Sequence, residues 1–215
     1  MQYPDFITLP YIQEYAAQHG EDASDQYPSA LPRHFIEAYT KPKQRVFDPF
    51  MGFGTSAFVA EDLGRVPYGV EADGERFEWS AGQLEGWQNI ICGDAAEIGT
   101  YDFPMMDFCI TSPPFIPMHE KWNPLYGGDP EYAGYDAYLA RMAEIFAAVK
   151  GVMKHNALIV VHVDNIAHKK SFTPLVRDMS LAVSRSFKPQ ADVIIKWEDA
   201  PDGYALTHCL VFKNA

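Results

Sequence analysis

Short apolar runs alternate with helical stretches along most of this chain, and this order constrains the fold more than any other feature. Strands that alternate with helices form a mostly parallel sheet covered on both faces, so we expect an α/β fold of seven strands. The last two strands are expected to form an antiparallel pair. The predicted strands are 44–50, 66–73, 88–95, 105–115, 156–165, 191–199 and 205–213, and the predicted helices are 31–40, 54–64, 74–87, a long one that begins near Asp136, and 173–187.

The length of the chain fits a single domain. Its 215 residues, 47% hydrophobic and 21% charged, are enough for a full core and have the composition of a soluble globular protein. We therefore expect one domain over residues 1–215, in which residues 1–30 are an extension made of loop and a short helix at 10–18. Cys92, Cys109 and Cys209 have no CxxC spacing and are expected to be buried, reduced thiols.

The charge and the N-terminus bound the location and the partners. The N-terminus has no basic region followed by an apolar one, and no apolar run reaches the ~20 residues of a membrane helix, so we expect a cytoplasmic protein without membrane contact. The formal net charge is −12, which argues against a tight, autonomous duplex binder because such proteins present a basic face to phosphates. A local basic cluster could still contact nucleic acid.

The stretch DPFMGFGTS at residues 48–56 leaves a predicted strand and enters a predicted helix. Gly52 and Gly54 permit positive φ and a close approach of the backbone to a ligand, but the same spacing also fits an ordinary tight turn. It is not the dinucleotide-binding pattern, since no third glycine follows at the required spacing.

Two acidic residues stand at the ends of the next two predicted strands. Glu71 ends the strand in GVEAD and could bind a ribose diol, and Asp94 in CGDA could accept from an adenine amino group. Acidic residues at strand ends are common surface features as well. Three polar features at three consecutive strand ends, where parallel sheets bind their ligands, together predict a site for an adenosine-like ligand.

The fourth of these strands ends in TSPPF at residues 111–115. Two consecutive prolines fix φ and remove two N–H donors, so the backbone here is stiff. A hydroxyl, Ser112, precedes the prolines and an aromatic ring, Phe115, follows them. This is a costly way to end a strand for structural reasons alone, and it favours a functional role.

DPFMGFGTS followed by TSPPF resembles the S-adenosylmethionine-dependent amino-methyltransferases that act on exocyclic nitrogens of nucleobases. The resemblance extends from about Pro28 to the C-terminus and implies a Rossmann-like class I methyltransferase fold. The Ser-Pro-Pro-Phe form is similar to that of enzymes that make N4-methylcytosine, whereas Asp-Pro-Pro-Tyr is more typical of N6-methyladenine enzymes. The resemblance therefore implies methyl transfer to DNA, with cytosine N4 favoured over adenine N6, in a restriction-modification or phage setting.

The resemblance also implies the residues that contact S-adenosylmethionine. The segment that begins at Pro28 would help to hold the methionine end of the cofactor. Asp48 would contact the methionine amino group directly or through water, while Phe50 could pack beside the cofactor or belong to the core. The predicted cofactor-binding residues are Pro28, Asp48, Pro49, Phe50, Gly52, Gly54, Thr55, Glu71, Ala72, Asp94 and Ala95.

The predicted catalytic residues are Ser112, Pro113, Pro114 and Phe115. An exocyclic amine is a poor nucleophile because its lone pair is delocalised into the ring, and hydrogen-bond acceptors on its two hydrogens localise that pair. The Ser112 hydroxyl and the Pro113 carbonyl can be these acceptors, and Phe115 can stack on the base. No metal is required, and the proton can leave to Ser112 or to water.

Target recognition is the least defined part of the sequence. Residues 116–135 are a candidate target-contacting loop in which His119, Trp122 and Tyr126 could bind the substrate, or could cap the core as a lid. Residues 165–171 and the N-terminal extension are other candidate contact surfaces.

Four further histidines do not form a ligand set with His119 and are predicted to be packing or surface residues: His155, His162, His168 and His208. Asp164 is a candidate for the rim of the site.

Alternatives remain open at this point. The chain could act on RNA or on a small amine-bearing molecule, or it could be a non-catalytic cofactor-binding subunit. DNA is favoured over RNA as the substrate, and a homodimer or a separate specificity partner is a candidate assembly.

Overall fold

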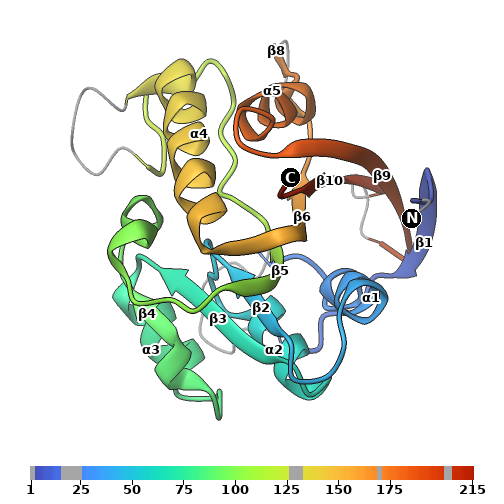
Figure 1. Ribbon diagram of the computed structural model, residues 1–215. Helices are drawn as coiled ribbons and strands as arrows, with labels where there is room; N and C mark the ends of the chain where they lie inside the picture. Colours follow the sequence, from blue (N-terminus) through green and yellow to red (C-terminus); the bar gives the residue numbers. More distant parts are fainter. Residues whose placement is uncertain (1–2, 16–25, 126–132, 169–170, 201–204) are drawn as a thin grey trace.

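The computed structural model describes residues 3–15, 26–125, 133–168, 171–200 and 205–215, which form an α/β fold around one large sheet (Figure 1). Within these residues the sheet has the strand order β1-β9-β10-β6-β5-β2-β3-β4. Its strands are β1 Phe6–Pro10, β2 Arg45–Asp48, β3 Val66–Glu71, β4 Ile90–Cys92, β5 Met106–Thr111, β6 Met153–Val163, β9 Lys188–Glu198 and β10 Leu206–Lys213. The helices are α1 Ala30–Tyr39, α2 Thr55–Asp62, α3 Gly74–Ala81, α4 Gly134–Val152 and α5 Leu175–Val183, with 3₁₀ helices at η2 Trp87–Asn89 and η3 Ala95–Thr100.

The expected mostly parallel sheet with a C-terminal antiparallel pair is confirmed. Strands β2 to β6 pair in parallel, whereas β10 runs antiparallel to both β9 and β6. Their parallel course brings the carboxyl ends of five strands to one edge of the sheet. Because β10 is antiparallel, its first residues also arrive at this edge, with His208 opposite Val163.

Among the described residues the sheet has eight strands, whereas seven were expected. The additional strand, β1, comes from the N-terminal extension and pairs in parallel with β9 at the sheet edge, with Ile7 opposite Ile195. Ile7 and Leu9 pack against the core cluster beneath, which explains why this short segment is extended. Pro10 ends the strand, where a missing N–H donor is tolerated. The helix predicted at 10–18 is wrong for the part described, since Tyr11–Tyr15 are not helical.

Helices cover both faces of the sheet, as expected. Helices α1 and α2 pack on one face and α4 and α5 on the other (Figure 1). Side chains of β6 alternate between them: Ile159 and Val161 join the cluster of α4 and α5, while Val160 joins that of α1 and α2. His162 therefore points to the face of α1.

Helix α4 shows why these segments are helical. Tyr138, Met142, Ile145, Phe146 and Val149 recur at spacings of three and four and are completely buried. This spacing places them on one stripe that faces the sheet. The positive charge of Lys150 in the last turn interacts favourably with the negative end of the helix dipole.

Two further features of the fold were not expected. A separate two-stranded hairpin, β7 Ile166–His168 and β8 Ser171–Thr173, follows β6. Cys109 and Cys209 are buried as predicted, but Cys92 is exposed because β4 lies at the sheet edge.

Within the described residues, no helix is long and apolar enough to cross a membrane.

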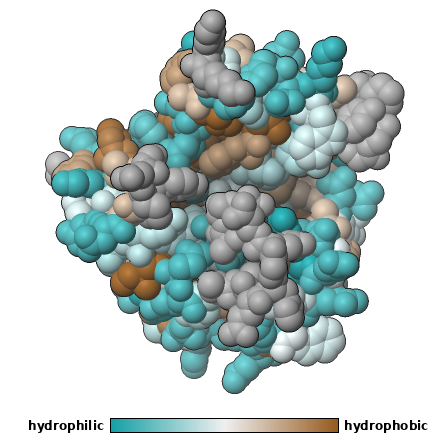
Figure 2. All heavy atoms as spheres, turned by 180° about the vertical axis from the view of Figure 1, so that it is seen from behind, coloured by the Kyte–Doolittle hydropathy of each residue, from teal (hydrophilic) through white to brown (hydrophobic). Residues whose placement is uncertain are grey.

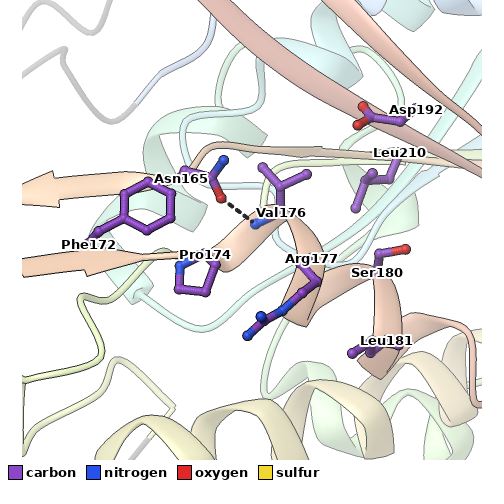
Figure 3. Close-up of a pocket in the computed structure, with 9 residues that line it drawn as sticks. All are labelled: Asn165, Phe172, Pro174, Val176, Arg177, Ser180, Leu181, Asp192 and Leu210. Atoms are coloured by element: carbon purple, nitrogen blue, oxygen red, sulfur yellow. Dashed lines mark hydrogen bonds between the residues drawn. The ribbon is translucent and has the colours of Figure 1, made fainter.

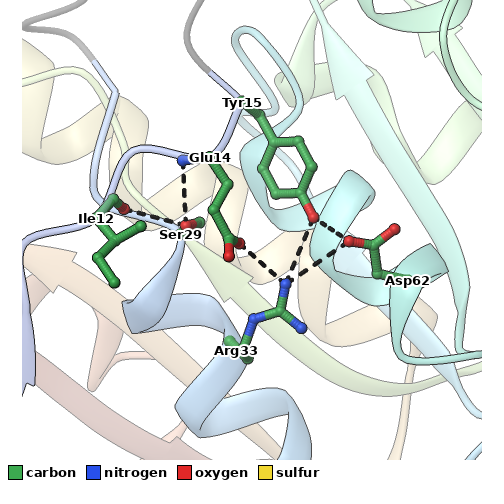
Figure 4. Close-up of polar contacts among 6 residues, drawn as sticks. All are labelled: Ile12, Glu14, Tyr15, Ser29, Arg33 and Asp62. Atoms are coloured by element: carbon green, nitrogen blue, oxygen red, sulfur yellow. Dashed lines mark hydrogen bonds and ion pairs between the residues drawn. The ribbon is translucent and has the colours of Figure 1, made fainter.

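The segment between β1 and α1 is fastened to both helices of its face (Figure 4). The Arg33 guanidinium donates to Glu14 at 3.0 Å and lies 3.6 Å from Asp62 of α2, and the Tyr15 hydroxyl donates to the same Asp62. The Ser29 hydroxyl donates to the Ile12 carbonyl at 3.0 Å. These contacts hold residues 11–15 and the start of α1 beside α2, the helix that follows the glycine loop.

Candidate active site

The glycine loop connects β2 to α2 at the carboxyl edge of the sheet. Gly52 has φ 53° and Gly54, the N-cap of α2, has φ 80°. A Cβ on Gly54 would lie 3.3 Å from both Phe58 and Ser80, whereas a Cβ on Gly52 would meet nothing within 4 Å. The two predicted glycines therefore differ: packing explains Gly54, while Gly52 borders open space that a ligand can fill.

Asp48 organises this loop from within. Its carboxylate accepts from the Phe50 N–H at 3.0 Å, from the Thr111 hydroxyl at 2.6 Å and from the Ser56 hydroxyl. Burial raises the pKa of Asp48 to about 6, against the lowering effect of these hydrogen bonds. Because a carboxylate offers about four acceptor sites, some capacity remains for the predicted contact with the cofactor.

Glu71 closes the loop from the end of β3. It accepts from the Gly52 N–H at 2.6 Å and from the Asp73 N–H at 2.8 Å, and burial raises its pKa. The side chain that the sequence assigned to a ribose is thus held rigidly beside Gly52. Each carboxylate oxygen of Glu71 accepts one of these hydrogen bonds and keeps a further lone pair, which a ribose diol could use.

The other predicted cofactor-contacting residues line the same edge. Asp94 accepts from the Ala96 N–H at 2.8 Å, forms an ion pair with Arg141 at 3.5 Å and is largely exposed. Phe50 is half-buried and packs against the core cluster of α4. Pro28, Pro49, Thr55 and Ala95 are buried, and Ala72 is exposed.

The buried hydroxyl of Tyr27 is the observation that best tests whether this edge fits a ligand. No described residue meets the geometry of a hydrogen bond with it, although the Ser56 hydroxyl is near enough to lower its pKa. Burial and nearby Asp48 raise its pKa well above the ordinary value. A buried polar atom without a partner beside an open glycine loop fits a polar ligand that completes its bonding. The residues present therefore fit S-adenosylmethionine.

The Ser-Pro-Pro-Phe segment follows β5 directly beside the glycine loop. Ser112 is half-buried and Pro113 is buried. Tyr138 of α4 donates to the Pro114 carbonyl at 2.9 Å, which fixes the segment without using the Pro113 carbonyl. The hydrogen bond from Thr111 to Asp48 joins the segment to the glycine loop.

His162, which the sequence analysis predicted to be a packing or surface residue, lies against Ser112 in the structure. Its Nδ1 lies 2.9 Å from the Ser112 hydroxyl, and its ring centroid lies 5.9 Å from that of Phe115. On its other side Nε2 lies 2.7 Å from the hydroxyl of Thr207, which donates to Asp164 at 2.7 Å. One signal could have found it: a single polar side chain interrupts the apolar run of β6 just before its carboxyl end.

The candidate target-contacting loop packs against the β7–β8 hairpin. The Met118 N–H donates to the Thr173 hydroxyl at 2.9 Å, and the rings of His119 and His168 stack at 5.6 Å. Trp122 is 61% exposed. Tyr126 lies outside the described residues, and helix α4 begins at Gly134, which ends the loop two residues earlier than predicted.

A groove of about 470 Å³ lies elsewhere, between α5 and the hairpin (Figure 3). Phe172, Leu181 and Leu210 line it, and Asn165 accepts from the Val176 N–H at 3.1 Å. Leu210 belongs to the core of α4 and α5, so this groove is on the opposite face from His162 and is not part of the candidate site.

The side of the molecule turned away from Figure 1 is mainly hydrophilic, with hydrophobic residues gathered in a hollow in its upper half (Figure 2). Within the described ranges, no three His, Cys, Asp or Glu side chains are grouped as metal ligands.

Known structures define the class of fold. TrmN from Thermus thermophilus matches 86% of this chain and 48% of its own, with a TM-score of 0.60 and 16% identity. The precorrin-6y C5,15-methyltransferase of Geobacter metallireducens matches 95% of this chain and 99% of its own, with a TM-score of 0.57 and 14% identity. A Streptococcus mutans methyltransferase in complex with SAH matches 87% of this chain and 98% of its own, at a TM-score of 0.53 and 10% identity. The fold is that of the class I S-adenosylmethionine-dependent methyltransferases.

Sequence comparison adds matches over part of the chain. Residues 6–82 match the sequence model of a family described as DNA methylase. Type II methyltransferase M.BglII of Bacillus subtilis is 41% identical over 59 residues, which are 26% of this chain and 16% of that protein. Type II methyltransferase M.XycI of Xanthomonas campestris pv. cyanopsidis is 36% identical over 70 residues, 33% of this chain and 23% of that protein.

The family model therefore matches the N-terminal part of the chain, and the solved structures show the fold of methyltransferases. The matched stretch spans less than a quarter of the length of either type II methyltransferase.

Proposed function

We propose that this chain transfers a methyl group from S-adenosylmethionine to an exocyclic amino group of a nucleobase in DNA, with cytosine N4 favoured over adenine N6. The observation that carries the proposal is the position of Ser112-Pro113-Pro114-Phe115. The segment leaves the carboxyl end of β5 and is joined through Thr111 and Asp48 to the loop where Gly52 borders open space. A place for a methyl donor and a rigid acceptor segment thus adjoin each other.

The bound cofactor would supply a methyl group on a sulfonium, which needs no metal for its activation. Gly52, Glu71, Asp48 and the unpaired Tyr27 hydroxyl are the groups of this chain that would hold it. Their arrangement is fixed before binding, because Glu71 and Asp48 already hold the loop backbone. A preformed site spends little binding free energy on ordering its loops.

The target amine would meet acceptors rather than a strong base. The Ser112 hydroxyl and the Pro113 carbonyl accept its two hydrogens, and these bonds strengthen as the nitrogen gains positive charge, which favours the transition state. Phe115 offers a ring for the base, held in place by its contact with His162. After the methyl group has been transferred, the amine loses a proton to Ser112 or to water.

The target strand would lie along an edge made by two segments. Residues 116–125 and the β7–β8 hairpin contact each other through Met118 and Thr173 and through the stacked rings of His119 and His168. Trp122 is exposed on this edge and can stack on a base. A duplex target requires base flipping, and a homodimer or a separate specificity partner would supply recognition that this short edge lacks.

RNA is the second candidate substrate. The net charge of −12 argues against a tight grip on duplex phosphates, and the bases of RNA loops are accessible without the opening of a duplex. The experiment offers a methyl-tritiated donor with duplex DNA, single-stranded DNA or transfer RNA. Label in DNA that co-migrates with N4-methylcytosine supports the proposal, whereas label only in RNA contradicts it.

A further inference from the structure

The proposed role of Ser112 requires its hydroxyl to accept, rather than donate, a hydrogen bond from the target amine. A serine hydroxyl can donate or accept a hydrogen bond, but a target amine needs an acceptor on its hydrogen. A serine that donated its own proton toward the amine would oppose the reaction. Something in the protein must take the Ser112 proton, and the only described side chain recorded within hydrogen-bonding distance of this hydroxyl is His162, at 2.9 Å.

We propose that Asp164 acts through Thr207 and His162, as a chain of positioning residues, to fix Ser112 as an acceptor toward the target amine. The inference rests on the proposed function for the role of Ser112, but the polarity of the chain is a property of the protein alone.

The polarity follows from the far end of the chain. An ionised carboxylate only accepts, so the Thr207 hydroxyl donates to Asp164 at 2.7 Å. The Thr207 oxygen then accepts from Nε2–H of His162 at 2.7 Å. Because a neutral imidazole carries one proton, Nδ1 is left as an acceptor, and Ser112 donates to it at 2.9 Å. The lone pairs of Ser112 remain for the amine.

The fold builds this chain from three strands. Ser112 follows β5, His162 and Asp164 come from the end of β6, and Thr207 comes from the start of β10. Antiparallel pairing of β10 with β6 places Thr207 at this edge, next to the pair His208 and Val163. His162 and Thr207 are buried at 6% and 0% exposure, so water does not compete with the bonds between them.

The protonation states agree with this direction. Burial lowers the pKa of His162 to about 4 and raises that of Asp164 to about 6, so at neutral pH the imidazole is neutral and the carboxyl is ionised. The nearest titratable group of β10 is His208, which pairs with Asp192 of β9 at 3.0 Å. Cys209 lies near Asp164, and the Tyr27 ring packs beside the His162 ring. Below about pH 6 a protonated Asp164 can donate to Thr207 and reverse every bond.

The test reads the His162 tautomer in the protein without ligand. At 24.2 kDa the chain suits ¹⁵N NMR of histidine side chains. We expect the Nε2–H form at pH 8 in the wild type, loss of that single form in Asp164→Asn and Thr207→Val, and its return in Thr207→Ser. Asp178→Asn is the matched control, since Asp178 is a hydrogen-bonded carboxylate of α5 outside the chain.

Activity then tests the consequence. Asp164→Asn is expected to lower kcat roughly tenfold or more at pH 8 with KM for the methyl donor unchanged, and wild-type kcat should fall as pH drops through about 6. An Nδ1–H tautomer in the wild type at pH 8, or an Asp164→Asn variant with wild-type tautomer and kcat, overturns the inference. If the tautomers are as expected but no nucleic acid is methylated, the polarity stands and the proposed function fails.

Discussion

The Thr111 hydroxyl donates to the Asp48 carboxylate across 2.6 Å, although the two residues are 63 positions apart in the chain. Thr111 is the last residue of β5 and Asp48 the last of β2, and both are buried. The contact joins the loop that would hold the methyl donor to the segment that would hold the acceptor. In-line methyl transfer depends on the relative position of these two, so this hydrogen bond is where the fold sets the geometry of the reaction.

Thr111→Val keeps the shape of the side chain and removes its hydroxyl. We expect the free energy of unfolding to fall by about 1–3 kcal/mol, because a buried carboxylate loses a partner. Urea denaturation measures it. Thr100→Val is the matched control: Thr100 donates to the Glu97 carbonyl on an exposed turn, so its loss should change stability by less than about 0.5 kcal/mol. Equal effects of the two variants would contradict the role given to Thr111.

Asp48 should make stability depend on pH. Its pKa is raised by burial to about 6 in the folded protein, from 3.8, so the folded state binds the proton more tightly than the unfolded state. The resulting stabilisation is complete below about pH 4 and is lost as pH rises through 6, by on the order of 2–3 kcal/mol. The difference in unfolding free energy between wild type and Asp48→Asn, followed from pH 4 to 8, isolates this contribution. A difference that does not vary with pH would show that Asp48 keeps an ordinary pKa.

Gly52→Val fills the open space of the glycine loop. We expect it to abolish S-adenosylmethionine binding measured by calorimetry, while the protein stays folded. Gly64→Val is the matched control: Gly64 also has a positive φ, 71°, with nothing within 4 Å of its Cβ, but it lies beyond the other end of α2. Both variants carry the same backbone strain of roughly 1–2 kcal/mol. Only Gly52→Val should lose the ligand, and unchanged affinity there would show that the ligand lies elsewhere.

Trp122→Ala tests the target edge. If the exposed ring stacks on a base, its loss should weaken nucleic-acid binding by about 1–3 kcal/mol, which is roughly 5-fold to 150-fold in Kd. Trp87→Ala is the control, because Trp87 is 57% exposed but lies in η2, at the start of β4 rather than at its carboxyl end. Fluorescence anisotropy with a labelled oligonucleotide compares the two, and an equal loss in both would remove Trp122 from the contact surface.

Local pattern and motif spacing were sufficient to predict the strands and α-helices from α1 onward, except for the β7–β8 hairpin, and the common edge of the two motifs. Elements whose stability comes from distant partners were not predictable in this way. Strand β1 is short and ends in a proline, and it is extended because it pairs with β9 and packs Ile7 and Leu9 on the core. Cys92 looked buried because its run is apolar, but edge position in a sheet is a property of topology.

The chain from Ser112 to Asp164 escaped prediction for the same reason. Its members come from three strands, and Thr207 reaches the site only because β10 runs antiparallel to β6. His162 does interrupt the apolar run of β6, but a histidine within an apolar strand is usually a packing residue, so this signal alone does not show what it contacts. Its role appears only when the register of two strand pairs is known.

The central claim is methyl transfer to a nucleobase amine that depends on Ser112. The most direct measurement is mass spectrometry of nucleosides from a methylation-deficient host that expresses the wild type, Ser112→Ala, or Ser184→Ala, a half-buried serine at the end of α5. The account predicts N4-methylcytosine in DNA with the wild type and Ser184→Ala, and roughly 10²-fold less with Ser112→Ala. No methylated nucleoside from a folded, cofactor-binding wild type, or equal amounts from Ser112→Ala, would contradict it.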